Sequence, residues 1–262
     1  MSLKLGSTSI GSLYLGSTKI SEAYLGSTKV YGSSAPVDPY NPLGLPPFTI
    51  RCKFNSGYTP DQGNSQTLVD ATTNVWDITN NSTDWSGLFP SCMDMTEVLG
   101  ANTTGVIDMS YMFGGCDNLT SVPLFDTSSV TSMDGTFGAC TALSSVPLFD
   151  TSSVQYMNSV FMYCTALSSV PLFDTSSVQY MNYAFSYCSA LSSVPLFDTS
   201  SVTEMNSAFS YCTAVESGAL ALYQQASSQA DPPLSYYNCF RDCGSGTATG
   251  AAELAQIPSD WK

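Results

Sequence analysis

Cysteine is the residue type with the clearest capacity for chemistry in this sequence. Six cysteines follow one another at intervals of 24 residues: Cys92, Cys116, Cys140, Cys164, Cys188 and Cys212. This spacing sets the side chains in a row, whereas a metal ion needs several ligands that converge on one point. On neighbouring helices, about 8–10 Å apart, the Cα atoms would also be too far apart for a disulfide. We therefore expect buried, reduced thiols that act as small hydrophobic groups.

A row of carboxylates recurs at the same interval: Asp126, Asp150, Asp174 and Asp198. Carboxylates of adjacent repeats could bind calcium. They could equally accept hydrogen bonds from the free N–H groups of helix N-termini, where the dipole favours negative charge, and we favour this capping role. Cys239 and Cys243, four residues apart, are the alternative pair for a disulfide or a metal. We expect neither a metal site nor a cofactor.

Both rows belong to a repeat of 24 residues, in which a phenylalanine precedes each cysteine by three positions. In one copy Val130, Met133, Phe137 and Cys140 are spaced 3, 4 and 3 residues apart. This spacing predicts one face of a helix. The residues before it, 126–129, offer side-chain oxygens for an N-cap.

A short apolar stretch follows each predicted helix, as in Val146-Pro147-Leu148-Phe149. Since proline lacks the N–H that a strand ladder needs, we expect a short, irregular strand there. The predicted fold class is therefore an α/β repeat: a leucine-rich-repeat-like solenoid of helix-plus-short-strand coils, with a small β-rich N-terminal segment. Within the apolar stretch we expect burial of both the phenylalanines (Phe125, Phe149, Phe173, Phe197) and the leucines (Leu124, Leu148, Leu172, Leu196). The alternative is that one row forms an exposed apolar strip.

The regions outside the repeats predict four further parts. Residues 1–31 contain LGSTSI, LGSTKI and LGSTKV at a period of 10, which indicates strand–turn–strand units in a β-rich attachment segment. Residues 32–47 are rich in proline and glycine and read as a linker. Residues 48–91 form a predicted N-terminal cap with a strand pair, on which Cys52 shares a face with Ile50 and Phe54. Residues 92–215 form the solenoid, and 216–262 a C-terminal cap with helices near 216–229 and 249–257.

Tyrosines occupy positions that vary between copies while the apolar positions stay nearly constant. On the helix face opposite the predicted core, the candidate partner-binding residues are Tyr156, Tyr163, Tyr180, Tyr183, Tyr187, Tyr211 and Tyr111. Tyrosine gives a large contact area at a low entropic cost, as in antibody paratopes. The alternative is that these side chains are half-exposed and merely pack along neighbouring helices.

The pattern FDTSSV-xx-M-xxx-F-xx-C-xx-L-xx-V resembles the BspA-like leucine-rich repeat surface proteins over roughly residues 85–215. The resemblance implies a curved solenoid used for adhesion or partner binding, and it implies no catalytic residues. The N-terminal LGSTK decapeptides are similar to repeats in tail or fibre proteins of phages of gut bacteria.

Composition excludes several classes of function. The formal net charge is −14, which disfavours binding to nucleic acid and to anionic membranes. The chain has no histidine, which removes His-based triads, and its carboxylates form no singular pair for glycoside hydrolysis. We therefore expect no enzyme. No apolar run approaches the roughly 20 residues that span a bilayer, and the N-terminus lacks the apolar core of a signal peptide.

The sequence thus favours a non-enzymatic adhesion or receptor-binding protein, associated with a phage tail or fibre, that recognises a protein or glycan of a bacterial surface. Its N-terminal segment would join other virion proteins or further copies of the chain. We expect it in the virion, or alternatively on the bacterial cell surface. The competing interpretation is a structural spacer of the virion or cell surface without its own ligand.

Overall fold

A computed structural model describes residues 13–15, 18–20, 23–25, 28–31, 38, 40–57 and 65–262. The chain divides into two compact units, Met1–Pro39 and Tyr40–Lys262. The first LGST motif, which begins at Leu5, and residues 32–37 and 39 of the predicted linker lie outside the described residues.

The described residues of the first unit form two separate antiparallel strand pairs. Strand β1 (Leu13–Leu15) pairs with β2 (Thr18–Ile20), and β3 (Ala23–Leu25) pairs with β4 (Thr28–Tyr31). Each hairpin has a Gly-Ser pair between its strands, so the predicted strand–turn–strand units are confirmed for these two copies. A single two-stranded hairpin is marginally stable in water.

The second unit begins with an antiparallel sheet of four strands in the order β6-β7-β5-β8. The strands are β5 (Thr49–Phe54), β6 (Ser65–Asp70), β7 (Val75–Thr79) and β8 (Met95–Asn102). Ile50, Cys52 and Phe54 alternate along β5 and are buried, as the period of 2 predicts. The sheet is larger than the expected strand pair.

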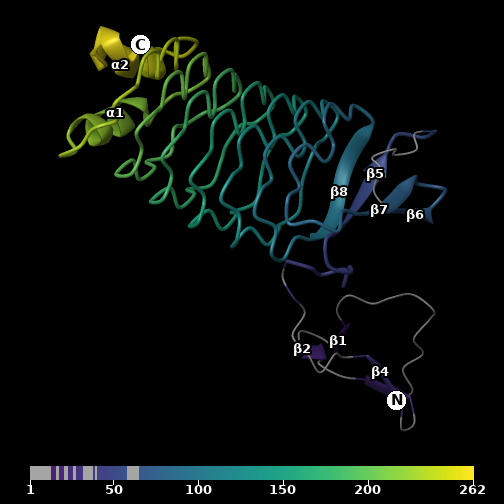
Figure 1. The fold of residues 1–262 in the computed structure, drawn as a ribbon. Coiled ribbons are helices and arrows are strands. Elements are labelled where there is room, and N and C mark those ends of the chain that lie inside the picture. Colours follow the sequence, from purple (N-terminus) through teal and green to yellow (C-terminus); the bar gives the residue numbers. More distant parts are fainter. Residues whose placement is uncertain are drawn as a thin grey trace. The chain divides into compact units, whose positions relative to one another are not determined.

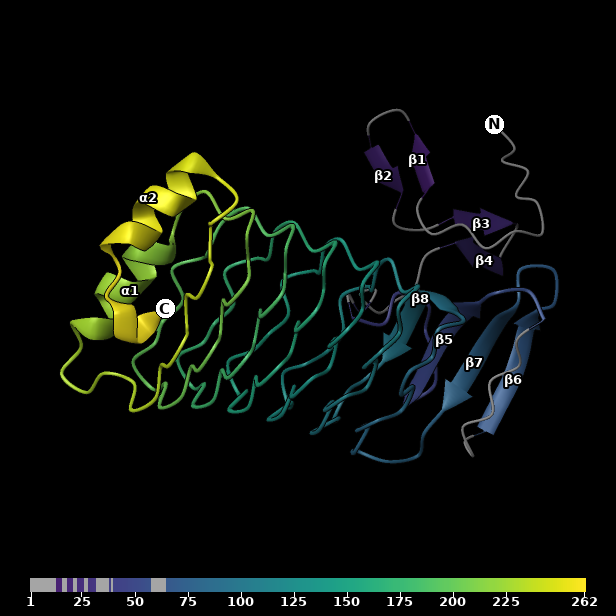
Figure 2. The same cartoon turned by 90° about the horizontal axis from the view of Figure 1, so that it is seen from above.

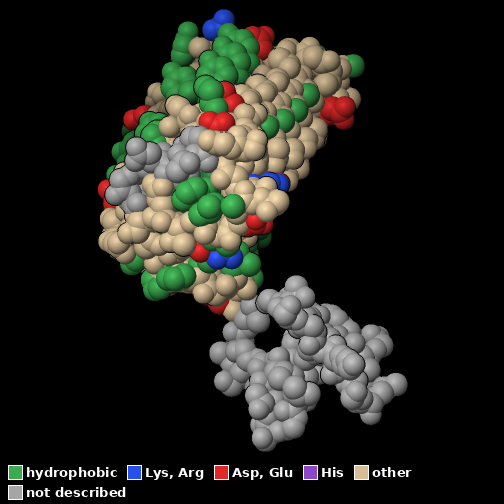
Figure 3. All heavy atoms as spheres, turned by 90° about the vertical axis from the view of Figure 1, so that its right-hand side faces the viewer, with side chains coloured by type: hydrophobic (Ala, Val, Ile, Leu, Met, Phe, Trp, Pro, Cys, Tyr) green, Lys and Arg blue, Asp and Glu red, His purple; other side chains and the backbone are tan. Residues whose placement is uncertain are grey.

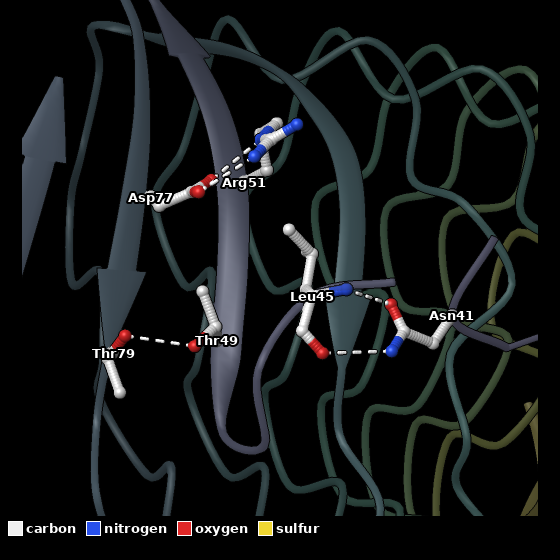
Figure 4. A network of polar contacts seen from close by, with 6 residues as sticks. All are labelled: Asn41, Leu45, Thr49, Arg51, Asp77 and Thr79. Atoms are coloured by element: carbon white, nitrogen blue, oxygen red, sulfur yellow. Dashed lines mark hydrogen bonds and ion pairs between the residues drawn. The ribbon is translucent and has the colours of Figure 1, made fainter. Parts of the chain in front are cut away.

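Polar side chains link the two central strands of this sheet, β5 and β7, on its other face. Figure 4 shows Arg51 on β5 reaching across to Asp77 on β7, with both N–O distances at 2.7 Å. Below them Thr49 and Thr79 share a hydrogen bond of 2.9 Å between their hydroxyls. Since arginine and carboxylate meet in a bidentate fork, this pair fixes the register of β5 against β7.

A stack of coils follows β8 and leads to the C-terminal helices (Figure 1). Each coil meets the next through parallel bridges between residues 24 apart, such as Asp108 with Ser132, Ser132 with Tyr156, and Tyr156 with Tyr180. Within one coil, alternate N–H groups of residues 109–115 donate to carbonyls of the following coil. The intervening N–H groups of Met112 and Gly114 donate to the carbonyl three residues earlier, both at 3.1 Å, and that of Ser110 donates to the carboxylate of Asp108 at 2.8 Å.

The predicted α/β class, a leucine-rich-repeat-like solenoid of helix-plus-strand coils, is wrong. Residues 103–218, all of them described, contain no helix and no strand, only turns and isolated bridges. The regular secondary structure is mainly antiparallel sheet, with two short helices, α1 (Ala219–Ser227) and α2 (Ala248–Gln256), and a 3₁₀ turn at Ser259–Trp261. These two helices lie where the sequence predicts them, and they cover the last coils (Figure 2).

Backbone conformation explains why the coils are not helical. Two residues in each coil, four positions apart, have positive φ: Tyr111 (55°) and Gly115 (77°), then Gly135 (58°) and Ala139 (60°), and so on. A left-handed residue ends a right-handed helix, so each segment becomes a series of turns. Successive turns return the apolar side chains to one side at the same 3, 4, 3 spacing. For this reason Val130, Met133, Phe137 and Cys140 are buried as predicted.

Stacked phenylalanines fill the centre of the coils. Ring centroids of Phe113, Phe137, Phe161 and Phe185 follow one another at 5.5–5.6 Å. A second row, Phe125, Phe149, Phe173 and Phe197, runs beside it at 5.7–6.4 Å. The expected burial of the neighbouring leucines is wrong for three of them, because Leu148, Leu172 and Leu196 are 53–61% exposed. In an extended segment adjacent side chains point to opposite sides, so a buried phenylalanine turns its leucine outward.

The C-terminal end of the stack is closed by aromatic residues. Phe240 stacks on Phe209 at 5.9 Å and on Trp261 at 6.2 Å, and Trp261 also stacks on Tyr236 at 4.1 Å. Trp261 is only 4% exposed. The last coil therefore has no open apolar face at this point.

Candidate binding surface on the coils

The tyrosines chosen from the sequence lie in three columns that run from coil to coil on the side opposite the buried residues. Tyr156 and Tyr180 occupy bridged positions. Tyr111 and Tyr183 occupy the first positive-φ position of their coils, and Tyr163, Tyr187 and Tyr211 the second. Each column has fixed backbone geometry, so a tyrosine in one coil is placed directly over its counterpart in the next.

Two of these columns form stacked ladders. Ring centroids of Tyr163 and Tyr187 are 4.6 Å apart, and those of Tyr187 and Tyr211 are 4.5 Å apart. In the other ladder the rings of Tyr156 and Tyr180 lie at 5.3 Å with an interplanar angle of 5°. The guanidinium of Arg241 lies 5.4 Å from the ring centroid of Tyr211 and covers the end of the longer ladder.

Tyr111 and Tyr183 are not stacked on another tyrosine of their own column. The next coil places Gly135 and Ser207, respectively, where a further ring would stand. A Cβ atom at Gly135 would lie 2.5 Å from ring carbons of Tyr111, so this glycine leaves room for the ring to lie over it. Five of the seven tyrosines are at least 37% exposed: Tyr111, Tyr156, Tyr163, Tyr183 and Tyr187.

The predicted helical face is therefore replaced by columns on a surface of turns. The structure brings Tyr156 and Tyr180 together in one ladder and Tyr163, Tyr187 and Tyr211 in another, and it leaves Tyr111 and Tyr183 outside both. Position along the repeat was sufficient to find these residues. Packing of these tyrosines along neighbouring elements was the alternative expected from the sequence, and the structure shows such packing, with ring centroids as close as 4.5 Å between Tyr187 and Tyr211.

An amide ladder beside the tyrosines was missed. The side-chain oxygen of Asp134 accepts the backbone N–H of Asn158 at 2.7 Å, and Asn158 does the same for Asn182 at 3.0 Å. Asn182 then accepts the backbone N–H of Asn206 and its side-chain amide, each at 2.9 Å. Burial raises the pKa of the Asp134 carboxyl. The recurring Met-Asn pairs at 157–158, 181–182 and 205–206 were the signal in the sequence.

The cysteines are buried free thiols, as predicted. Each thiol of the central row donates to a phenylalanine carbonyl 27 residues earlier, for example Cys164 to Phe137 at 3.0 Å and Cys212 to Phe185 at 3.0 Å. Burial raises the pKa of Cys164 and of Cys212 to about 12. A thiol with so little thiolate character is a poor nucleophile and a poor metal ligand.

The aspartate row closes turns and does not cap helices, since no helix follows it. The carboxylate oxygen of Asp174 accepts the backbone N–H of Ser176 at 3.0 Å and its hydroxyl at 2.6 Å. These hydrogen bonds lower the pKa of Asp174. Asp126 and Asp150 accept the same two bonds from Ser128 and Ser152. Among the described residues, no group of three or more His, Cys, Asp or Glu side chains is placed to hold a metal ion.

Charge on the molecule is sparse. On the face shown in Figure 3, lysine and arginine form only a few isolated spots among uncharged polar side chains and backbone. The sequence has no lysine or arginine between Lys53 and Arg241, so the coils carry carboxylates without any cation. No helix in the described part of the chain is long and apolar enough to cross a membrane.

One backbone unit repeated every 24 residues, closed by a sheet at one end and by helices at the other, defines a capped repeat protein. A family model described as "Mycoplasma protein of unknown function, DUF285" matches residues 83–194 and 165–227, which together span more than half of the chain. The chain therefore belongs to the DUF285 family. Neither a curated protein nor a solved structure matches it.

Proposed function

We propose that this protein is a non-enzymatic adhesion or receptor-binding protein, and that the tyrosine surface of its coils recognises a bacterial surface. One observation carries the proposal: exposed tyrosines are stacked into ladders on coils whose interior barely changes from copy to copy. A binding surface can vary in this way without loss of the fold, because the core positions alone hold the coils together.

Stacking prepares these rings for binding. A tyrosine that is held between two others loses little further side-chain entropy when a partner covers it. The entropy lost when side chains become ordered is a large part of what weakens association. The rings expose their edges and hydroxyl groups, which offer both apolar contact and hydrogen bonds. The ladders therefore combine a low entropic cost of fixing the side chains with both apolar and hydrogen-bonding groups, as binding surfaces require.

The proposal extends to the setting of the protein. The resemblance of the repeats to BspA-like surface proteins and of the N-terminal decapeptides to phage tail or fibre proteins supports a place in the virion, or alternatively on the bacterial cell surface. The two hairpins of the first unit would attach the protein to other virion proteins or to further copies of itself, because isolated hairpins gain stability from a partner.

The test is binding of the purified full-length protein to whole gut-bacterial cells. Changing Tyr180, Tyr183 and Tyr187 together to serine should reduce saturable binding at least tenfold, since these rings form the middle of the surface. Tyr237→Ser is the matched control, because this tyrosine is 70% exposed but lies outside the three columns. Equal binding by the triple variant and the wild type would refute the proposal.

A spacer without a ligand is the second candidate, and the four copies of LFDTSSV favour it. Identical coils make a uniform rod, and a rod needs no variation on its surface. If neither the wild type nor the control variant binds any cell tested, the spacer role stands and the tyrosines serve to stiffen the stack.

A further inference from the structure

Both tyrosine ladders begin in the same coil. In the column of Tyr163, Tyr187 and Tyr211, the two preceding coils carry Gly115 and Ala139. In the column of Tyr156 and Tyr180, the preceding coils carry Asp108 and Ser132. In these two columns the side chains therefore change from non-aromatic residues to tyrosines in one step, between the coil of residues 132–139 and the coil of residues 156–163.

This step leaves ring faces open. Tyr187 has a ring on both of its faces, at 4.6 and 4.5 Å. Tyr163 stacks on Tyr187 alone within the described part of the chain, so its other face is turned toward the methyl group of Ala139. The exposed fraction is 42% for Tyr163 and 37% for Tyr187. By the same argument Tyr156 turns a face toward Ser132.

The coils that precede the step offer polar groups but no cation. In the coil that precedes the step, the half-buried carboxylate of Asp134 accepts the backbone N–H of Asn158, and the hydroxyls of Ser110 and Ser132 share a hydrogen bond of 2.7 Å. Carboxylate and hydroxyl oxygens have further lone pairs that can accept hydrogen bonds. An anionic ligand would meet these carboxylates with no lysine or arginine to compensate, so its binding is disfavoured.

We infer that the step between Ala139 and Tyr163 binds a pyranose ring of an uncharged glycan. One face of a pyranose presents C–H bonds of slight positive charge, which suit the negative face of a phenol ring. Its hydroxyl groups can donate to Asp134 and Ser132, and Tyr156 supplies a second ring face in the same coil for a neighbouring sugar. This inference rests on the proposed function and specifies the class of its ligand.

Filling the step is the most direct test. Ala139→Tyr places a ring on the exposed face of Tyr163, and the backbone accepts it, because Ala139 (φ 60°) is conformationally equivalent to Tyr163, Tyr187 and Tyr211 (φ 60–62°). The melting temperature should stay the same or rise. Saturation-transfer NMR of glucose, galactose, mannose, N-acetylglucosamine and N-acetylgalactosamine at millimolar concentration should show a signal with the wild type that this variant loses.

A second variant removes the ring faces themselves. The double variant Tyr156→Ser with Tyr163→Ser should lower the affinity for the sugar about tenfold, which corresponds to about 1.4 kcal/mol. The control variant Tyr237→Ser should leave this affinity unchanged. If the wild type binds none of the sugars but its binding to cells still depends on Tyr180, Tyr183 and Tyr187, the ligand is not a glycan and the proposed function survives. Sugar binding that persists in Ala139→Tyr overturns the assigned site. Binding of the protein to cells that disappears at high salt indicates a cationic ligand on the cell and overturns the inference as well.

Discussion

At the scale of single residues, the cysteines show how burial changes a reactive group into a structural one. The pKa of Cys164 rises to about 12 because the fold buries the thiol and leaves its anion without solvation. The same thiol donates a hydrogen bond to the Phe137 carbonyl oxygen, with an S–O distance of 3.0 Å. The thiol therefore contributes to the contact between coils in its protonated form only.

Because the folded protein keeps these thiols protonated, its stability should fall at alkaline pH. An unfolded thiol has a pKa of about 8.5, so above that pH the unfolded chain releases protons that the folded chain keeps. The free energy of unfolding should fall by about 1.4 kcal/mol per pH unit for each such thiol, until the folded pKa of about 12 for Cys164 and Cys212 is reached. Urea denaturation between pH 8 and 9.5, before tyrosine ionises, measures the slope.

A double variant, Cys164→Ala with Cys212→Ala, is the control for this slope. It should be less stable than the wild type at pH 8 but lose less stability as the pH rises. A free energy of unfolding that does not change over this range would contradict the assignment of raised thiol pKa values.

At the scale of the coil, the asparagine ladder joins each turn to the next through its side chains. Asn182 is its central member, because it accepts two hydrogen bonds from Asn206 and donates one to Glu204 at 2.8 Å. Such a ladder holds adjacent coils in one register, since a slip would leave every amide without its partner.

Asn182→Ala should therefore destabilise the protein by about 1–3 kcal/mol, the cost of leaving a partly buried N–H without an acceptor. Asn118→Ala should change the free energy of unfolding by no more than about 0.5 kcal/mol, because Asn118 is exposed and makes a single contact, to the carbonyl of Met93. Urea denaturation of both variants separates the two cases, and similar midpoints would show that the ladder is not structural.

The coil is also the scale at which the sequence and the structure differ most. The period, the terminal helices and the buried positions other than those of Leu148, Leu172 and Leu196 could be predicted, because each depends mainly on which residues are apolar and how they are spaced. The turn backbone could not, since a helix and a series of turns place Val130, Met133 and Phe137 on the same side. The available signal was the glycines of these two columns, Gly87, Gly115 and Gly135, as glycine favours positive φ.

For the second unit as a whole, stability should depend on contacts between neighbouring coils and on the two ends. The C-terminal end relies on Trp261, which packs on Tyr236, Phe240 and Tyr223. The opposite end relies on the four-stranded sheet, whose strand β8 leads directly into the coils. Loss of either end should first destabilise the coils beside it.

Trp261→Ala tests this directional behaviour. Removal of the buried indole should cost about 3–5 kcal/mol locally. Hydrogen exchange should then accelerate in residues 205–243 while the amides of β5 and β8 keep their protection. Uniform acceleration along the whole unit would contradict nearest-neighbour stability and would indicate one cooperative transition.

The near-identity of the central coils has a consequence for how the number of repeats can change in evolution. Four copies of LFDTSSV imply stretches of similar coding sequence, and unequal recombination between them would insert or delete whole coils in frame. Because every coil presents the same upper and lower surface, such an event would leave both ends intact and change the length of the stack by about 4.8 Å. The number of tyrosines in each ladder would change with it, so a lineage could alter its reach and its avidity in a single genetic step.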